Sequence, residues 1–374
     1  MKFTVSSTAL FSRLTALSRV FNSKNSLPIL DCYLFEITGR NLTITASDSE
    51  TTLVSNLELA DCDQDGRFCI KAKTIHDSIK MIADQPITLN VNMDTMEIGG
   101  TYQNGRFSII GERADDYPTT HQASDVEYKF AIKESALLAG ISYSLFATAD
   151  DGLRPVMTGI YFDFTPDCLV FVGTDGRKLV RCKEYSIKST EPMGFILPKK
   201  PATVLKGLLQ KNDEDIQLTF TDKLAIVKTS EFTLTTRLID GRYPVYNAVI
   251  PVNNPFRATL DRAVFISTLR RIIVFSSASS SMVKLVFTKD MLTVSGQDVD
   301  FSTSAEEHLM CEYDGPELKI GFKGTLLIDI LNNLESDEVV LAMADSSRAG
   351  LITPATQNES SEVLMLLMPL MLND

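Results

Sequence analysis

The chain has 374 residues, of which 44% are hydrophobic, and a net charge of −12 at pH 7. That length provides enough material for two or three domains with buried cores. The longest apolar run, Val363 to Leu372, is about half of the ~20 residues that a membrane-spanning helix needs, and it predicts a buried terminal strand instead. The first residues, MKFTVSST, lack the charged and apolar regions of a secretory signal, which favours a cytoplasmic protein.

The apolar spacing in the first third of the chain changes from period two to period three or four and back, which predicts alternating strands and helices. Lys2 to Val5 is predicted to be a strand. Residues 7–21 are predicted to be a helix with three leucines, Leu10, Leu14 and Leu17, on one face. Further strands are expected over residues 31–37, 41–46, 50–57 and 66–71, followed by a helix over 73–82 and a strand over 87–91.

This pattern of segments occurs three times along the chain. Such self-similarity at a fixed period indicates a repeated structural unit. The opening Lys2-Phe3-Thr4-Val5 matches Lys129-Phe130-Ala131-Ile132 at an offset of 127, and Arg257-Ala258-Thr259-Leu260 is the third copy. The same offset aligns Leu27-Pro28-Ile29-Leu30 with Arg154-Pro155-Val156-Met157. Three later segments each predict a strand, a short helix and a strand: residues 70–91, 196–220 and 319–343.

The repeats predict an α+β fold made of three tandem domains, each with two helices packed on antiparallel sheet. We expect the domains to span residues 1–122, 127–251 and 255–374, with polar linkers near 119–127 and 251–254. A single irregular α+β domain is the alternative that the residues alone leave open.

Positive charge is concentrated in the predicted helices. The six helical segments carry a net charge of +8 against −12 for the whole chain, so the remainder must carry −20. Lysines on solvated helix faces are common for reasons of solubility alone. The separation of sign between the six segments taken together and the rest of the chain nevertheless favours a basic surface that binds phosphates without reading bases. The segments are 7–21, 73–82, 133–147, 199–211, 261–275 and 324–334.

The sequence offers no catalytic constellation. The motifs GxxxxGK[ST], GxSxG, HExxH and GxGxxG are absent, and the three histidines, His76, His121 and His308, lie far apart. Six cysteines at irregular spacings predict free, mostly buried thiols. The aspartates in Ala114-Asp115-Asp116 and Thr174-Asp175-Gly176 are typical of tight turns. We therefore predict no enzyme activity, cofactor or metal.

Five segments, spread over the full length, resemble the bacterial sliding clamp, the beta subunit of DNA polymerase III. The resemblance implies a head-to-tail homodimer, a ring whose hole is lined by helices and whose outer wall is made of sheets. It implies a non-catalytic processivity factor that encircles double-stranded DNA topologically and tethers the replicative polymerase and other replication and repair proteins. The segments are Met1-Lys2-Phe3-Thr4-Val5, Leu27-Pro28-Ile29-Leu30, Thr174-Asp175-Gly176-Arg177-Lys178-Leu179, Asp240-Gly241-Arg242-Tyr243-Pro244 and Met368-Pro369-Leu370-Met371-Leu372.

The resemblance also implies a pocket between the second and third domains for a client peptide that carries Gln and large apolar residues. Apolar and Met side chains suit a groove that binds several clients, although Met157 and Leu179 alone would be read as core. Met371 stands where the family often has Arg, and the chain continues to Asn373-Asp374. The implied pocket residues are Arg154, Met157, Thr174, Gly176, Arg177, Leu179, Pro244, Val249, Leu366, Met368, Pro369, Leu370 and Met371.

Two further surfaces follow from the resemblance. Duplex DNA is expected near Lys24, Lys73, Lys199 and Lys200, and an ATP-driven clamp loader is expected to open the ring. The subunit interface joins the first domain of one chain to the third of the other. Its expected apolar part is Phe107, Val274 and Phe275, with Glu306 and Glu307 as ion-pair candidates.

Two other classes of protein remain open from the residues alone. An enzyme with a diffuse interdomain active site predicts turnover that is lost when the three histidines are replaced together by Gln. A purely structural repeat protein predicts neither salt-sensitive DNA association nor binding of the client peptide.

Overall fold

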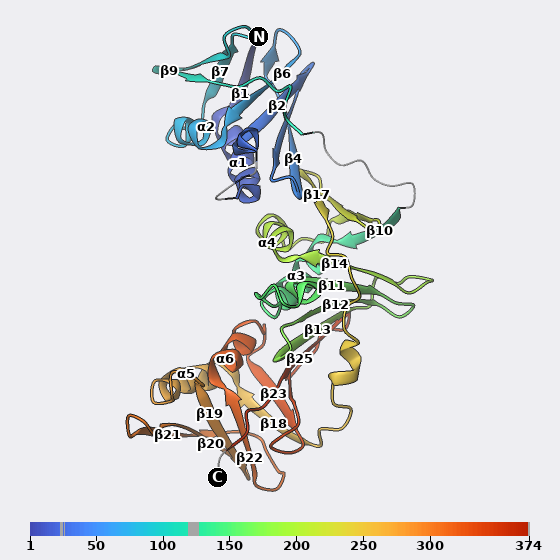
Figure 1. The fold of residues 1–374 in the computed structure, drawn as a ribbon, viewed down its shortest axis with the longest axis vertical. Helices are drawn as coiled ribbons and strands as arrows, with labels where there is room; N and C mark the ends of the chain where they lie inside the picture. The colour runs from blue at the N-terminus through green and yellow to red at the C-terminus, as the bar shows by residue number, and fades with distance from the viewer. Residues whose placement is uncertain (23–24, 26, 119–126, 373–374) are drawn as a thin grey trace. The chain divides into compact units, whose positions relative to one another are not determined.

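The computed structural model describes residues 1–22, 25, 27–118 and 127–372, and the chain divides into two compact units (Figure 1). Unit 1 comprises Met1–Ser135 and Thr203–Leu238, and unit 2 comprises Ala136–Ala202 and Ile239–Asp374. Across the described residues, no helix is long and apolar enough to cross a membrane. All six cysteines are free and five of them are buried, as the sequence predicts.

The described residues contain helices in pairs that follow the three repeats. Figure 1 shows α5 and α6 side by side, and α1 and α2 are in contact in the same way. The α-helices are α1 (Ser7–Leu17), α2 (Ala72–Ile79), α3 (Glu134–Leu145), α4 (Lys199–Leu208), α5 (Arg262–Ile273) and α6 (Gly324–Asn332). The 3-10 helices are η1 (Ser18–Val20), η2 (Pro28–Asp31), η3 (Pro155–Thr158) and η4 (Tyr246–Val249).

Unit 1 holds two antiparallel sheets, and α1 and α2 contact both of them. The five-stranded sheet has the order β5-β1-β7-β8-β9: β5 (Asp61–Cys62), β1 (Lys2–Ser6), β7 (Pro86–Val91), β8 (Glu97–Tyr102) and β9 (Gly105–Ile110). The eight-stranded sheet has the order β10-β15-β16-β17-β4-β3-β2-β6: β10 (Tyr128–Lys133), β15 (Asp215–Phe220), β16 (Leu224–Lys228), β17 (Phe232–Arg237), β4 (Thr51–Glu58), β3 (Asn41–Ser47), β2 (Cys32–Thr38) and β6 (Gly66–Lys71).

Unit 2 repeats this arrangement, with α5 and α6 contacting both of its sheets. The eight-stranded sheet has the order β14-β11-β12-β13-β25-β24-β23-β18: β14 (Met193–Pro198), β11 (Gly159–Phe164), β12 (Leu169–Thr174), β13 (Lys178–Glu184), β25 (Ser361–Leu367), β24 (Gly350–Pro354), β23 (Glu338–Met343) and β18 (Phe256–Asp261). The four-stranded sheet has the order β21-β20-β19-β22: β21 (Thr303–Met310), β20 (Met291–Asp298), β19 (Met282–Thr288) and β22 (Leu318–Lys323).

The predicted triplication is confirmed. The matched openings form β1, β10 and β18, each followed by a helix, and the two segments aligned on a proline form η2 and η3. The predicted first helix ends as an α-helix at Leu17 and continues as η1. Its leucines, Leu10, Leu14 and Leu17, are all fully buried, because one face of a helix at that spacing turns to the core.

Each eight-stranded sheet contains strands from two different repeats, which the sequence pattern did not predict. In unit 1 the four strands of the first repeat join four strands of the second through the β4–β17 pair. In unit 2 the second and third repeats join through β13 and β25. Pairing across repeats satisfies backbone groups that an exposed edge strand would leave open.

The junction of β4 with β17 is rich in hydroxyl groups. The buried side chains of Thr51 and Thr236 form a hydrogen bond of 3.0 Å across it. Beside it, the Arg13 guanidinium forms an ion pair of 2.8 Å with Glu231 and lies 5.1 Å from the centre of the Phe232 ring. These contacts anchor α1 of the first repeat to the sheet strand of the second.

The junction of β13 with β25 is centred on one carboxylate. Glu362 accepts a hydrogen bond of 2.6 Å from Arg181 and one of 3.1 Å from the hydroxyl of Tyr185, and Lys183 lies 3.3 Å away. Burial raises the pKa of the Glu362 carboxyl, but the ammonium of Lys183 and the guanidinium of Arg181 outweigh it and hold that pKa below its usual value. The ionised carboxylate therefore stabilises the junction.

Replacing Glu362 with Gln should destabilise the folded chain by about 1–3 kcal/mol at pH 7, because the largely buried Arg181 loses its charged partner. Since the folded-state pKa is depressed, this contribution is present at neutral pH and disappears as pH falls through that pKa. Urea unfolding between pH 7 and pH 3 measures the difference. Glu359→Gln, an exposed acid nearby, is the control; equal stabilities of wild type and E362Q at pH 7 would contradict the assignment.

One expectation is wrong. The apolar run from Val363 to Leu372 does not form a strand throughout, because β25 ends at Leu367. Pro369, two residues on, has no N–H to donate to a sheet, and Met368 and Met371 are exposed. The run is therefore a buried strand followed by a separate terminal segment.

Candidate functional site

The turn between β12 and β13 is built by the Thr174-Asp175-Gly176 motif. The Asp175 carboxylate accepts hydrogen bonds from the backbone N–H groups of Arg177 (2.8 Å) and Lys178 (2.9 Å) and from Nζ of Lys178 (2.9 Å). Burial raises the pKa of Asp175, but these hydrogen bonds outweigh it and hold the pKa below its usual value. Gly176 adopts φ +83°, where side chains are strained. The aspartate is thus a turn residue, as the sequence indicates.

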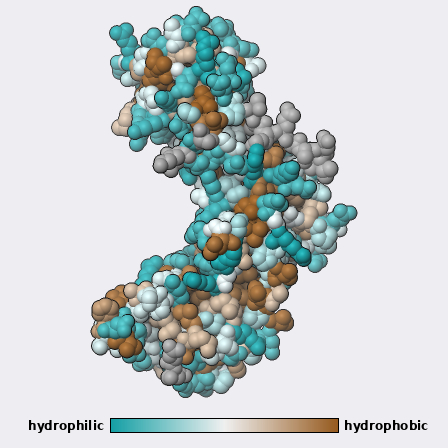
Figure 2. All heavy atoms as spheres, in the orientation of Figure 1, coloured by the Kyte–Doolittle hydropathy of each residue, from teal (hydrophilic) through white to brown (hydrophobic). Residues whose placement is uncertain are grey.

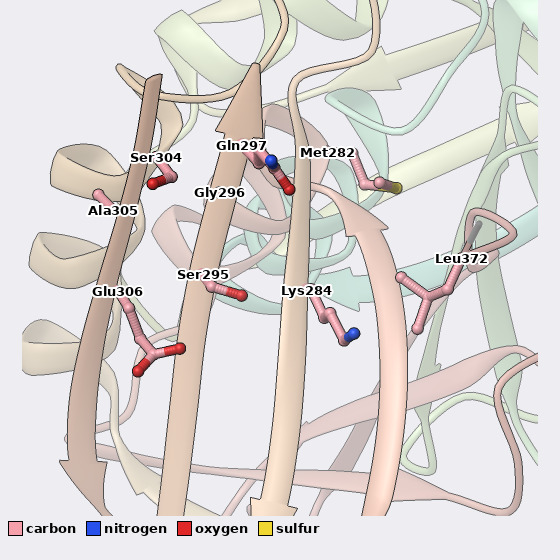
Figure 3. Close-up of a pocket in the computed structure, with 9 residues that line it drawn as sticks. All are labelled: Met282, Lys284, Ser295, Gly296, Gln297, Ser304, Ala305, Glu306 and Leu372. Carbon is pink, nitrogen blue, oxygen red and sulfur yellow. The ribbon is translucent and has the colours of Figure 1, made fainter. Parts of the chain in front are cut away.

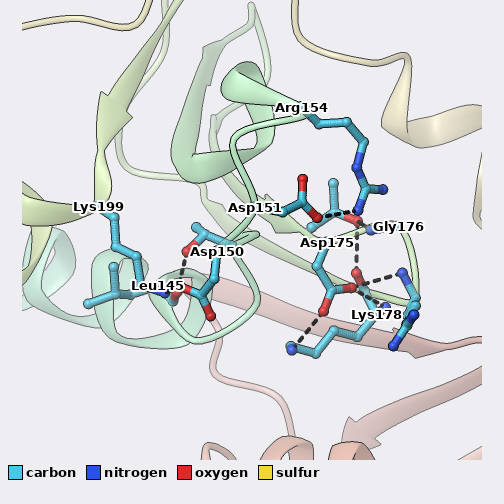
Figure 4. Close-up of polar contacts among 11 residues, drawn as sticks. Leu145, Asp150, Asp151, Arg154, Asp175, Gly176, Lys178 and Lys199 are labelled. Atoms are coloured by element: carbon cyan, nitrogen blue, oxygen red, sulfur yellow. Dashed lines mark hydrogen bonds and ion pairs between the residues drawn. The ribbon is translucent and has the colours of Figure 1, made fainter.

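Arg154 covers this turn. Its Nη2 lies 3.1 Å from a carboxylate oxygen of Asp151, and a Cβ on Gly176 would lie 2.4 Å from its Nη1 (Figure 4). Thr174, which is buried, donates a hydrogen bond of 2.8 Å to the carbonyl of Lys178. Arg154, Thr174, Gly176 and Arg177, four residues of the implied pocket, therefore belong to one small region of unit 2.

Two implied pocket residues lie underneath this region. Leu179 and Leu366 are paired across β13 and β25, and each is only 2% exposed. They belong to an apolar cluster with Tyr243, against which Val156 and Ile250 pack. Met157 is partly buried, and its N–H donates to the carbonyl of Arg154 at 2.9 Å. Leu179 and Leu366 are thus core residues, not exposed walls of an open pocket.

The exposed apolar residues of the implied pocket come from two other segments. Val249, at the end of η4, and Met368 are exposed, and Pro244 is partly exposed. The N–H of Met368 donates to the carbonyl of Arg177 at 2.9 Å, which places Met368 next to the turn covered by Arg154. Figure 2 shows hydrophobic residues in separate patches on a mainly hydrophilic surface.

The rest of the terminal segment follows the four-stranded sheet of unit 2. The N–H of Leu370 donates to the carbonyl of Gly321 on β22 at 2.8 Å. Leu372 lines a shallow cavity of about 430 Å³ with Lys284 and Glu306 on the sheet face (Figure 3). No contact described in the structure joins Leu370 or Met371 to the turn at Gly176. Pro369 is partly exposed between the two.

The described lysines implied in DNA binding lie on helices. Lys73 is exposed on α2, and Lys199 and Lys200 begin α4. Lys24 lies outside the described residues. Lys199 forms an ion pair with Asp150, and its hydrogen bond holds the pKa of the Asp150 carboxyl below its usual value.

An arginine outside the implied set, Arg19 of η1, lies against α4. The Arg19 guanidinium occupies the space beside Gly207, where a Cβ would lie 2.3 Å from Nη1. Arg19, from the first repeat, is thereby brought next to Lys206 on α4 of the second repeat. Two of the positive charges summed along the sequence, those of Arg19 and Lys206, thus belong to neighbouring elements of unit 1.

The residues implied in the subunit interface lie on two edge strands, β9 and β21, and in the segment that follows α5. Phe107 is on β9, the last strand of its sheet, with its ring over Gly100 of β8. Val274 and Phe275 follow α5 and are exposed, 77% and 39% respectively. Glu306 and Glu307 are on β21, the last strand of the four-stranded sheet.

Glu307 already has a partner within the chain. It pairs with Arg271 of α5 at 2.6 Å, and the hydrogen bond holds the pKa of Glu307 below its usual value. Glu306 lies 3.7 Å from His308. In the part of the chain that the structure describes, no three His, Cys, Asp or Glu side chains could hold a metal ion together.

Sequence reasoning missed the loop that holds Arg154. Asp150 and Asp151 pair with Lys199 and Arg154, and Leu153 between them is 91% exposed. A leucine next to an Asp-Asp-Gly turn is a signal for an exposed apolar side chain, but the partners of the aspartates are not readable from spacing.

Three repeated α+β modules joined through shared antiparallel sheets define the class of three-domain clamps. Profiles of the N-terminal, central and C-terminal domains of the DNA polymerase III beta subunit match residues 1–121, 131–245 and 247–369. The chain therefore belongs to the DNA polymerase III beta subunit family, the bacterial sliding clamps. It is a processivity factor and a non-catalytic accessory subunit, which sets aside the enzyme alternative.

The relatives match over nearly the whole chain. The beta sliding clamp of Pseudomonas aeruginosa is 26% identical over 98% of this chain and 99% of its own length, and that of Haemophilus influenzae is 28% identical with the same coverage. A crystal structure of the Pseudomonas aeruginosa clamp superposes with a TM-score of 0.93 at 26% identity, covering 100% of both chains. The beta subunit of Thermotoga maritima, at 23% identity and a TM-score of 0.90, shares the fold.

Proposed function

We propose that two copies of the chain assemble head to tail into a ring that encircles duplex DNA in the bacterial cytoplasm. The ring slides without sequence preference and tethers the replicative polymerase and other replication and repair proteins. Each copy contributes three domains, residues 1–122, 127–251 and 255–374, and an ATP-driven loader opens the ring. The observation that carries this proposal is two sheet edges, β9 in unit 1 and β21 in unit 2, that are open to a strand of another copy.

β9 ends the five-stranded sheet of the first repeat and β21 ends the four-stranded sheet of the third. Among the described residues no strand pairs with the outer edge of either one. Unpaired edges of this length are templates for pairing with another chain. Pairing β9 of one copy with β21 of a second would extend both sheets, and repeating it on the other side would close a ring of two.

The inner surface of the ring is assigned to the helices. Arg19, Lys206 and the lysines at the start of α4 place positive charge there without any base-reading motif. Contacts with phosphates alone bind DNA independently of sequence and allow sliding. The acidic remainder of the chain keeps DNA away from the outer surface.

The client site is assigned to the turn at Gly176, with Arg154 above it, Leu179 and Leu366 as its floor, and Val249 and Met368 as exposed apolar anchors. Apolar anchors in a partly preformed groove are typical of peptide recognition. A Pseudomonas aeruginosa clamp with a TM-score of 0.93 was solved bound to griselimycin. That complex supports a ligand-binding surface in the family fold.

The proposal is tested by loading the labelled protein with its loader onto a nicked circular plasmid and separating bound from free protein by gel filtration. The protein should remain on the circle at high salt and leave when one restriction cut linearises it. A protein held by contacts alone would show the same retention on circular and linear DNA, and that result would exclude the ring.

Removing positive charge from α4 and its neighbour should weaken DNA contact in a salt-dependent way. Replacing Arg19, Lys200 and Lys206 together by Ala should reduce the slope of log affinity against log salt by about 2–3, since each phosphate contact contributes ~0.9. Affinity for short duplex DNA at several salt concentrations measures the slope. Lys129→Ala, which removes a charge on the edge strand β10, is the control, and an unchanged slope in the triple variant would contradict the assignment.

A further inference from the structure

The loop between α3 and η3 is held by few contacts. Its base is closed by a hydrogen bond of 2.8 Å from the N–H of Ala149 to the carbonyl of Met157. Ala147 and Ala149 are buried at this base, whereas residues 150–154 are exposed. A segment with little buried apolar surface is low in local stability. The position of this loop therefore depends on the polar contacts of residues 150–154 at its tip.

Two adjacent aspartates make those contacts in opposite directions, as Figure 4 shows. Asp150 pairs with Lys199 at the start of α4, and Asp151 pairs with Arg154. Arg154 in turn lies over Gly176, in the region assigned to the client. Residues 150–154 thus connect Lys199, which is assigned to DNA binding, with Arg154, which is assigned to the peptide site.

We propose that Asp150 and Asp151 are positioning residues that couple client binding to DNA binding: the Asp150–Lys199 pair holds the loop in a closed position in which Arg154 covers the turn at Gly176. This inference rests on the proposed function. When a DNA phosphate binds Lys199, the Asp150–Lys199 ion pair breaks, and the loop is no longer held in the closed position. Arg154 then leaves the turn, and the client peptide reaches it.

The size of the coupling follows from the exposure of the pair. The side chains of Lys199 and Asp150 are 41% and 86% exposed, and an exposed ion pair changes an equilibrium by about two- to five-fold. The coupling is reciprocal, because a client that favours the open loop must favour DNA-bound Lys199 by the same factor. We expect the peptide to bind about two- to five-fold more tightly to DNA-loaded protein.

The test is fluorescence anisotropy of a labelled Gln-Leu-x-Leu-Phe peptide, titrated with free protein and with protein loaded on a nicked circular plasmid. Asp150→Asn should raise the affinity of the free protein to that of the loaded wild type and remove the effect of DNA. Asp150→Glu, which can restore the pair, should return both affinities toward wild type. Asp167→Asn, an exposed acid on the β11–β12 turn, is the charge-matched control.

The outcomes separate the coupling from the function on which it rests. Equal peptide affinities of free and loaded wild type, or an Asp150→Asn variant that behaves as wild type, would overturn the coupling while the client site stands. Absence of peptide binding by wild type would overturn both. A DNA effect that persists unchanged in Asp150→Asn would also reject the role of this loop.

Discussion

Replacing Val274 and Phe275 together by Asp should convert the protein from a dimer into a monomer. Both side chains are exposed in the single chain, so the substitutions leave its core intact. In the proposed ring they meet the edge strand β9 of the other copy. Each interface would lose about 3 kcal/mol of apolar burial, and a ring of two has two equal interfaces, so dimer stability should fall by about four orders of magnitude or more.

Sedimentation equilibrium over a concentration series measures this change, and retention on circular DNA should be lost with it. Val252→Asp makes the same kind of substitution, with one added negative charge in place of two, at a fully exposed valine outside both edge strands, and it should remain dimeric. Thermal unfolding shows whether the double variant is folded. A folded V274D/F275D protein that remains dimeric at micromolar concentration would refute the interface.

Charge should contribute less to this interface than the apolar residues. Glu307 is already paired with Arg271 of the same chain; Arg271 is exposed and Glu307 is partly exposed. A new partner in a second copy would have to displace or share that pair, and exposed pairs contribute little. Phe107, whose ring lies over Gly100, is held in place within its own sheet before any partner arrives.

The elements and their order could be read from the sequence because they depend on local periodicity. β6 was predicted at its observed bounds, and the leucine face of α1 was predicted correctly. The partners of the strands could not be read in the same way. β4 pairs with β17, about half the chain away, and nothing in either segment specifies a partner in the next repeat.

The candidate site shows the same limit. The motif around Gly176 was found because turn chemistry is local, whereas the pairing of Asp150 with Lys199 depends on how a loop and a helix meet. Composition alone gave a wrong prediction for Val363 to Leu372. Apolar content predicted one strand over the whole run, but the strand ends before Pro369. Leu179 and Leu366 were found by resemblance, and Leu179 taken alone was read as core, but the pairing of the two leucines came only from the register of β13 with β25.

Ending the chain at Leu367 should abolish client binding while the fold and the dimer persist. An earlier end, at Glu362, would be uninformative, because it removes most of β25, which pairs with β13 at seven positions. The shorter deletion leaves this strand whole. It removes Met368 beside Arg177 and the contact of Leu370 with Gly321.

Anisotropy of the labelled peptide against this truncation should show at least a ten-fold loss from roughly micromolar affinity, because central apolar anchors typically contribute 2 kcal/mol or more each. A chain ending at Leu372 is the matched control and should bind as wild type does, since every described residue of the site remains. If the chain ending at Leu367 is folded, dimeric and binds the peptide unchanged, client recognition lies elsewhere on the ring. If it loses the peptide but still stays on circular DNA, the exposed terminal segment recruits partners and takes no part in encircling DNA.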